Sequence, residues 1–224
     1  MRLFLICLSM LLLPLLSALP KGETTPRLIL VTGCGRSGTQ YISKVLNQSG
    51  LNVTHEHGMG TDGCVSWLMA ARVDWAPWGP LAKRYQFKHI FHQVRDPVKV
   101  IQSYYNTPPT TTWEWIAKSI PEIKESDSNL TKCTKYWYYW NLMAEAGAEW
   151  TYRIEEIDTV YPIMGRKLGL PFNPQTLERV SRKSNSKGRP NYPISWKVLE
   201  EQLDPVLYKK VRNLAGRYGY SLDK

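Results

Sequence analysis

The predicted fold follows from residues 28–46, LILVTGCGRSGTQYISKVL. The stretch opens on a continuous apolar run, which is typical of a strand buried on both faces of a parallel sheet. A glycine-rich turn follows, and then a helix whose apolar residues share one face and which Gly50 would end. A strand, a tight turn and a helix in immediate succession favour an anion site, because unpaired N–H groups and the positive end of the helix dipole point at the same place.

The turn also supplies donors that suit a phosphate or a sulfate. The glycines of G-C-G-R-S-G permit a tight turn and a close approach of the backbone to a ligand. Arg36, Ser37 and Thr39 add charged and hydroxyl donors. We therefore expect this turn to bind an anion.

Two known phosphate motifs fit the turn only in part. Gly33 and Gly38 have the spacing of the nucleotide triphosphatase loop, but Thr39 and Gln40 stand where that loop requires Lys and then Ser or Thr. Without those residues, γ-phosphoryl transfer would lack its main charge stabilisers. The glycines also match the dinucleotide pattern G-x-G-x-x-G, which is weak when it stands alone, and Glu56 is the only acidic candidate for its ribose contact.

The rest of the chain predicts strands that alternate with helices. Further strands are expected at residues 51–54, 89–94 and 152–154. Helices are expected after Asp62, Asp96-Pro97, Asn173-Pro174 and Asp204-Pro205, and over residues 132–146. This alternation predicts a doubly wound α/β fold, with a mainly parallel sheet flanked by helices, in a single domain over residues 27–224.

Three details of this prediction bear on the site. Asp62 is expected to cap a helix whose one side carries Val65, Leu68 and Met69. The aromatic cluster at residues 136–140 is interpreted as core packing, with a stacking platform for a sugar or an aromatic acceptor as the alternative. His89 and His92, both in one expected strand, are interpreted as structural.

Residues 1–20 form a separate targeting segment. From residue 3 to residue 19, fourteen of seventeen residues are apolar, and no charge lies between Arg2 and Lys21. This length is at the lower limit for a membrane span and Pro14 interrupts it, so a cleaved signal peptide and a short signal anchor both remain open. The rest of the chain is expected in the secretory pathway, in the Golgi lumen or secreted, and an uncleaved leader would be a type II membrane anchor.

Sequons and cysteines agree with that compartment. Asn47, Asn52 and Asn129 each begin an N-x-S/T tripeptide, as in a glycoprotein. The cysteines outside the leader are Cys34, Cys64 and Cys133. Their number is odd, so at most one bridge forms within the chain and one thiol is left over. No set of Cys and His residues has the spacing of a zinc site.

The composition narrows the class of protein and of partner. Hydrophobic residues make up 43% of the 224 residues and charged residues 21%, which excludes wholesale disorder. The net charge of +10 predicts an anionic partner or substrate. Nucleic acid is not the expected anion, because of the leader and because no recognition module is present.

The turn G-C-G-R-S-G-T resembles the 5′-phosphosulfate loop of the PAPS-dependent sulfotransferases. In that family a strand ends in Arg, and a Ser on the following helix joins it in holding the 3′-phosphate of the cofactor. Here F-H-Q-V-R-D-P-V-K-V-I-Q-S-Y-Y, residues 91–105, has Arg95 and Ser103 eight apart, with the Asp-Pro cap between them. Residues 152–158 and 194–203 also look like later elements of the family, so the resemblance covers essentially the whole chain after the leader.

The resemblance implies a P-loop-like sulfotransferase architecture that uses PAPS (3′-phosphoadenosine 5′-phosphosulfate) and needs no metal. The residues that it assigns to the cofactor are Gly35, Arg36, Ser37, Gly38, Thr39, Gln40, Arg95, Ser103, Lys187 and Gly188. The last two lie in residues 179–199, a segment with six cations and no acid. Similar basic loops cover the cofactor in the family, and a solvated surface loop is the alternative.

Sulfuryl transfer needs a cation at the leaving oxygen and a proton acceptor opposite, because the acceptor attacks sulfur in line. Arg36 fits the first role and stands where many members of the family have Lys. The family uses a Glu or a His as the base, and T-H-E-H, residues 54–57, offers both. Glu56 is favoured and His55 is the next candidate, followed by His57 and Asp62. An ordinary cap or surface turn is the structural alternative for this segment.

The main hypothesis is a luminal enzyme that transfers the sulfuryl group of PAPS to a hydroxyl or an amine. A carbohydrate is the leading acceptor class because of the compartment. The acceptor is expected to contact residues 58–80 and 104–115, which are rich in Trp and Pro. The alternatives are a P-loop kinase, which the missing Lys argues against, and a non-catalytic secreted module that binds anionic glycans.

Overall fold

A computed structural model of the chain describes residues 26–56, 58–70, 85–107, 112–182 and 192–221. The expected leader, residues 1–20, lies outside the described residues, as do His57, Lys187 and Gly188. Residues 71–80 and 108–111 of the two expected acceptor segments are also outside them.

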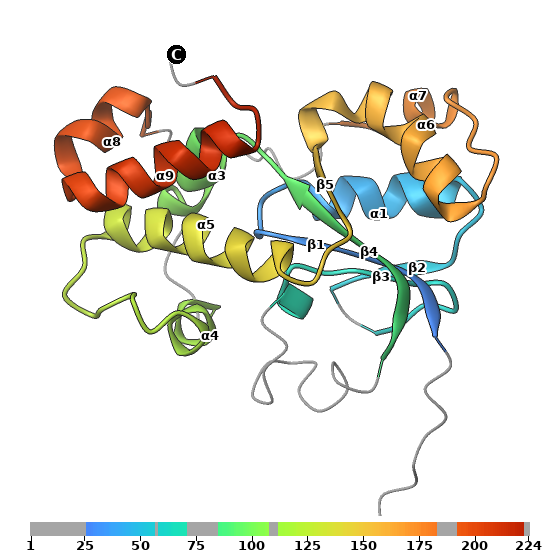
Figure 1. Ribbon diagram of the computed structural model, residues 1–224, viewed down its shortest axis with the longest axis horizontal. Helices are drawn as coiled ribbons and strands as arrows, with labels where there is room; N and C mark the ends of the chain where they lie inside the picture. The colour runs from blue at the N-terminus through green and yellow to red at the C-terminus, as the bar shows by residue number, and fades with distance from the viewer. Residues whose placement is uncertain (1–25, 57, 71–84, 108–111, 183–191, 222–224) are drawn as a thin grey trace, which may run out of the picture.

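A parallel sheet forms the centre of the described structure (Figure 1). Its five strands are β1 (Arg27–Gly33), β2 (Val53–His55), β3 (Gly63–Val65), β4 (Phe87–Val94) and β5 (Trp150–Arg153). They lie in the order β2-β3-β1-β4-β5, and every neighbouring pair is parallel. The predicted α/β fold with a parallel sheet is therefore confirmed. In such a sheet all strand carboxyl ends meet at one edge, where ligands bind in open α/β folds.

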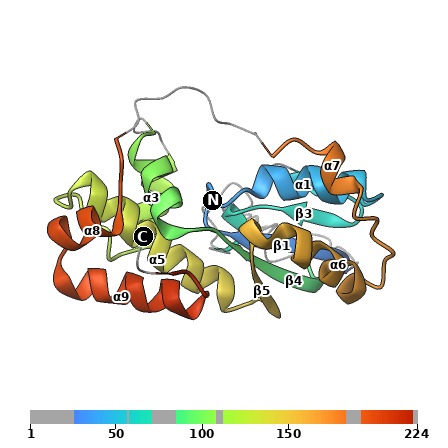
Figure 2. The same ribbon diagram turned by 90° about the horizontal axis from the view of Figure 1, so that it is seen from above.

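Helices cover both faces of the sheet, as Figures 1 and 2 show. On one side lie α1 (Thr39–Gln48), α6 (Ile157–Leu168) and α7 (Thr176–Arg179). On the other lie α3 (Pro97–Tyr105), α5 (Asn129–Glu145), α8 (Trp196–Gln202) and α9 (Pro205–Arg217). The remaining elements are α4 (Thr112–Ser119) and two 3₁₀ turns, η1 (Leu68–Ala70) and η2 (Ile154–Glu156). None of these described helices is long and apolar enough to cross a membrane.

Strand β1 is buried on both faces because its side chains alternate between the two helical layers. Ile29 and Val31 pack in the cluster that contains α1 and α6, whereas Leu30 packs toward η1. All three are at most 1% exposed. The continuous apolar run is thus explained by burial on both sides.

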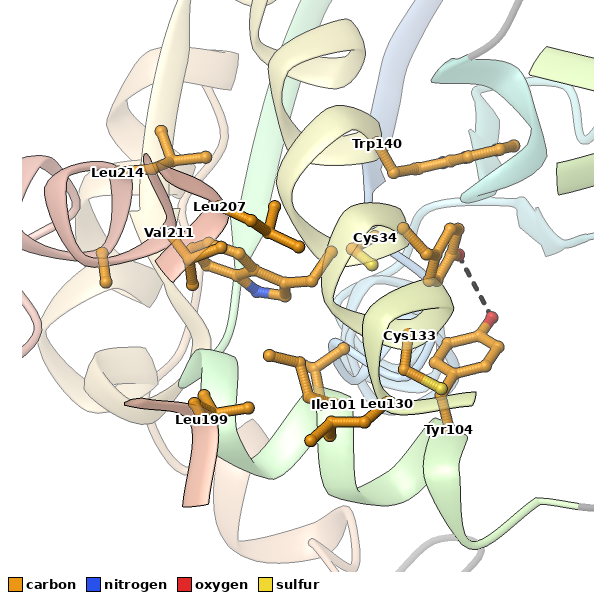
Figure 3. Packing of buried hydrophobic residues seen from close by; sticks show 14 of the residues in the cluster. Cys34, Ile101, Tyr104, Leu130, Cys133, Trp140, Leu199, Leu207, Val211 and Leu214 are labelled. Atoms are coloured by element: carbon orange, nitrogen blue, oxygen red, sulfur yellow. Dashed lines mark hydrogen bonds between the residues drawn. The ribbon is translucent and has the colours of Figure 1, made fainter. Parts of the chain in front are cut away.

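The second helical layer is built around the aromatic helix α5. Tyr136, Trp137 and Trp140 are at most 1% exposed, which confirms core packing as their role. Figure 3 shows how α5 packs against Ile101 of α3 and Val211 of α9. A dashed line in the same view marks a hydrogen bond from the Tyr104 hydroxyl, which joins Tyr136.

Capping explains where several helices begin. The Asp96 side chain accepts the N–H of Lys99 at the start of α3, and Asp204 caps α9 in the same manner, as predicted. Helix α5 begins three residues before the predicted position because Ser128 caps it. Asn173 does not start a helix; its side chain accepts the N–H of Gln175 in a turn, and α7 follows.

The helix predicted after Asp62 is wrong. Residues Gly63–Val65 form strand β3, which inserts between β1 and β2, and only η1 is helical. Gly63 has φ 142°, and a Cβ there would lie 1.8 Å from the carbonyl oxygen of Ile29. This close strand pairing requires glycine, and the i, i+3, i+4 spacing of the following apolar residues misled the sequence argument. The Asp62 carboxylate instead accepts the N–H of Asn52 at 2.7 Å.

Histidines and cysteines in the described structure are buried or bonded. His92 is fully buried with Nε2 3.1 Å from Asn141 Oδ1, and burial lowers its pKa to about 4, which agrees with a structural role. The cysteines Cys34, Cys64 and Cys133 are free and buried. Burial raises the pKa of all three thiols.

Candidate functional site

The glycine-rich turn joins β1 to α1 at the carboxyl edge of the sheet and borders a pocket of about 180 Å³. The residues that line it are Gly35, Arg36, Gly38, Thr39, Gln40, His55, Glu56, Trp67, Arg95 and Tyr104. Gly38 is the N-cap of α1 with φ 95°, and in the described structure no side chain caps that helix and no acid lies in its first turn. An uncapped helix start at a pocket wall leaves N–H groups for an anion.

The two segments expected to bind phosphates meet at this pocket. Arg36 Nε donates to Ser103 Oγ at 2.9 Å, which joins the turn to α3. Arg95, directly after β4, donates from Nη1 to the carbonyl oxygen of Arg36 at 2.9 Å. Two guanidinium groups and one hydroxyl are thus gathered beside the helix start. This concentration of positive charge favours a ligand with more than one anionic group.

The conformation of the turn brings the Arg36 side chain to the pocket at a cost in backbone strain. Arg36 has φ 66°, a left-handed conformation that L-residues other than glycine seldom adopt. Strain of this kind persists only where the surrounding structure enforces it, and it is frequent at functional sites. Here the hydrogen bonds from Arg95 and to Ser103 hold both the main chain and the side chain of Arg36.

Ser103, which is bonded to Arg36, does not itself line the pocket, and neither does Ser37. Ser37 lies inside the turn. Its side chain is fully buried, and its Oγ has no hydrogen-bond partner among the described residues. Ser37 does not line the pocket, so its place in the turn rests on its main chain. The Ser37 N–H donates to the Cys34 carbonyl at 3.2 Å, and its carbonyl accepts from Gln93 Nε2 at 2.8 Å.

The two favoured base candidates reach the pocket from the end of β2. His55 Nε2 lies 3.1 Å from Thr39 Oγ1, and Thr39 Oγ1 donates to Glu56 Oε1 at 3.4 Å. His55 Nε2 is also 3.3 Å from Glu56 Oε1. Both side chains therefore converge on the first residue of α1. Glu56 has φ 61°, so it too is held in the left-handed region.

Burial makes the Glu56 carboxyl a weaker acid than an ordinary glutamate. Its side chain is 13% exposed, and loss of hydration raises its pKa from 4.5 to about 7. Hydrogen bonds act in the opposite sense, led by Ser66, whose Oγ donates to Oε2 at 3.0 Å, and supported by the N–H groups of Trp67 and Leu68. The carboxyl is thus about half ionised near neutral pH, which suits a general base.

The lower-ranked base candidates are not at the pocket as described. His57 lies outside the described residues. Asp62 precedes β3 and is therefore at the opposite edge of the sheet from the strand carboxyl ends, which corrects its place among the base candidates. No group of three or more His, Cys, Asp or Glu in the described ranges could hold a metal ion.

Several side chains at the pocket were not named individually in the sequence argument, although Trp67 and Tyr104 lie within the two segments expected to contact the acceptor. Trp67 and Tyr104 line the pocket, and Ser66 donates a hydrogen bond to Glu56. Gln93 and Tyr136 form hydrogen bonds with the main chain of the turn. Ser66 could have been found from its position directly after β3, had that strand been recognised. Tyr104 follows Ser103 in a motif already identified, but nothing in the sequence shows which way its ring points.

Comparisons with known proteins address the fold. No protein-family model matches the chain, and no curated protein sequence does. The sulfotransferase domain from the curacin biosynthetic pathway has a similar structure, with a TM-score of 0.51 and 13% identity over 88% of this chain and 99% of that one. A mouse sulfotransferase, SULT7A1, complexed with PAP, gives a TM-score of 0.40 and 15% identity over 88% of this chain and 86% of its own. The chain has a sulfotransferase-like fold.

Proposed function

We propose that the chain is a PAPS-dependent sulfotransferase that transfers the sulfuryl group to a hydroxyl or an amine of an acceptor in the secretory pathway. One observation carries the proposal: the turn, Arg95, and the Glu56 and His55 pair all border one pocket, and Ser103 is bonded to Arg36 of the turn. Sulfuryl transfer requires groups that donate hydrogen bonds to an anion and a proton acceptor opposite them. The pocket has such donors on one side and a carboxyl of near-neutral pKa on the other.

The residues present fit a donor with two separated phosphate groups. The uncapped start of α1 and the Arg36 guanidinium suit the 5′-phosphosulfate, because N–H groups and a cation meet there. Arg95 and Ser103, on the β4 and α3 side, suit the 3′-phosphate. The bound donor would supply the activated sulfuryl group, and the chain would bind it and orient it.

The chain's own groups divide the chemistry between them. Arg36 stabilises negative charge at the leaving oxygen as a fixed cation, since a guanidinium keeps its proton at all physiological pH values. Glu56 takes the proton of the attacking acceptor, and its Oε1 is the oxygen beside Thr39 and His55. His55 stays in the proposal as the alternative base, because it reaches the same Thr39 hydroxyl.

A carbohydrate is the acceptor class that we propose. Trp67 and Tyr104 line the pocket together with Glu56, and aromatic side chains suit the apolar faces of a sugar ring. The expected compartment, the Golgi lumen or the exterior, offers such acceptors. The proposal for the acceptor rests on these two arguments together.

The test supplies labelled PAPS with a panel of glycans, proteins and small alcohols. Wild type is compared with Arg36→Ala and Glu56→Ala, and Arg166→Ala and Glu200→Ala serve as matched controls at exposed positions. Transfer is expected to fall by at least about 100-fold in the first two variants and to stay within twofold in the controls. Undiminished transfer in Arg36→Ala would refute the leaving-group role.

Thermal stabilisation separates the proposal from its alternatives. A ligand that binds only the native state raises the melting temperature, so PAP without metal is expected to stabilise the chain and ATP with Mg²⁺ is not. The reverse result would favour a kinase. Binding of heparin without any transfer from PAPS would favour the non-catalytic glycan-binding module.

A further inference from the structure

A buried amide side chain connects the sheet to the glycine-rich turn between β1 and α1. Gln93 of β4 is fully buried and pairs with Gly33 of β1 and Tyr152 of β5 in the sheet register. Its Nε2 donates to the Ser37 carbonyl oxygen at 2.8 Å, and its Oε1 accepts from the Tyr152 hydroxyl at 2.7 Å. Neither Gln93 nor Tyr152 lines the pocket.

The chemistry of the partners fixes which way this amide points. A main-chain carbonyl can only accept, so the NH₂ end of Gln93 must face Ser37 and the oxygen end must face Tyr152. Tyr152 must then donate, and burial raises its pKa well above the usual value, so its proton is retained. The two hydrogen bonds therefore form a single chain from β5 through β4 to the turn.

The hydrogen bond from Gln93 to the Ser37 carbonyl also sets the direction of the Gly38 N–H. In a trans peptide unit, the carbonyl oxygen and the following N–H point in opposite directions. When Gln93 holds the Ser37 carbonyl beneath the turn, the Gly38 N–H is turned the other way, toward the pocket that Gly38 lines. The opposite peptide orientation would point a carbonyl oxygen at the anion, which would repel it.

Two other N–H groups of the turn donate hydrogen bonds within the protein and are not directed at a ligand. Gly35 donates to the Tyr136 hydroxyl at 2.8 Å, and Ser37 donates to the Cys34 carbonyl. Beyond Ser37 the main chain enters α1, whose start has no side-chain cap, so Gln93 acts on the peptide unit that leads into this helix start.

We propose that Gln93 is a positioning residue that aims the Gly38 N–H at the bound anion, while Tyr152 pairs with the oxygen of its amide. The inference deepens the proposed function, since the anion there would be the 5′-phosphosulfate, but it concerns anion binding and requires no transfer. A side chain that merely filled the core would affect stability without affecting the affinity for anions.

The test compares variants that remove the Gln93 amide with a variant that keeps it. In Gln93→Leu/Tyr152→Phe both polar groups are removed together, and Tyr152→Phe alone is the matched control, because it keeps the amide that faces Ser37. Gln93→Met, which keeps buried volume without an amide, replaces the double variant if that variant does not fold. The probes are inorganic sulfate and PAP, and the readout is the ¹H–¹⁵N signal of Gly38 during titration, together with the dissociation constant.

In wild type and Tyr152→Phe, the Gly38 signal is expected to shift on saturation with sulfate. In the double variant the dissociation constants for sulfate and PAP are expected to rise by about 5- to 20-fold, the loss of one oriented hydrogen bond to a charged ligand. An affinity for sulfate within twofold of the control overturns the inference, and so does a wild-type Gly38 signal that does not respond to saturating sulfate. A protein that binds sulfate but not PAP contradicts the proposed donor while the sulfate titrations still decide the role of Gln93.

Discussion

Replacing Glu56 by Gln should stabilise the protein by an amount that grows as the pH rises from about 4.5 to 7. The folded-state pKa of about 7 lies above the ordinary 4.5, so the native state holds this proton more tightly than the unfolded chain does. The stability that protonation contributes is fully present below pH 4.5 and is lost as the pH rises toward and through 7. At about 1.4 kcal/mol for each pH unit between the two pKa values, the native state loses about 3 kcal/mol by pH 8.

The variant cannot ionise, so it escapes that loss. Its melting temperature should exceed that of wild type by about 6–12 °C at pH 8 and by about 1–2 °C at pH 4.5, for a chain of this size. Any hydrogen bond that the Gln amide forms less well is independent of pH, so the comparison between the two pH values isolates the titration. The measurement is differential scanning calorimetry at both pH values, with Glu200→Gln as the exposed control. An equal melting-temperature difference at the two pH values would show that the carboxyl is not desolvated.

Three further outcomes follow from single contacts. Ser66→Ala removes the strongest hydrogen bond to ionised Glu56, so the acid limb of the profile of kcat/KM against pH should move to higher pH by about half a unit or more; an unmoved limb would contradict the contact. Gly35→Ala should lower stability by about 1–3 kcal/mol in chemical denaturation, because its Cβ would lie 2.4 Å and 2.8 Å from two buried tyrosine hydroxyls; wild-type stability would refute that packing. In protein secreted from a eukaryotic host, mass spectrometry should find a glycan at exposed Asn52 and none at Asn47, whose amide nitrogen already donates to two main-chain carbonyl oxygens.

The sequence predicted the parts of the fold that local chemistry decides. A buried strand, a glycine turn and a helix were all read from one stretch, and the Asp-Pro starts of α3 and α9 were found because a side-chain cap is a local signal. Strand β3 was missed, since it has only three residues and exists because Gly63 lets two strands approach closely. That approach is a long-range property, which periodicity alone cannot reveal.

The site shows the same division between local and long-range information. Arg36 was identified as a donor in the glycine turn, Arg95 and Glu56 were assigned from the family resemblance, and the structure brings all three to one pocket. The side chains that hold them could not be identified in this way. Tyr136 lies 101 positions from Gly35 in the sequence, and only the packed helix α5 shows that the two are bonded.

The three buried thiols have a consequence for handling the protein. Alkylating reagents attack thiolates, and burial suppresses both access to Cys34, Cys64 and Cys133 and their ionisation. Because Cys34 lies in the turn and Cys133 in α5, their labelling would report loosening of the turn and of the helix that packs against it. Cys34, Cys64 and Cys133 should stay unlabelled for as long as the protein stays folded, so their labelling is a direct measure of its integrity.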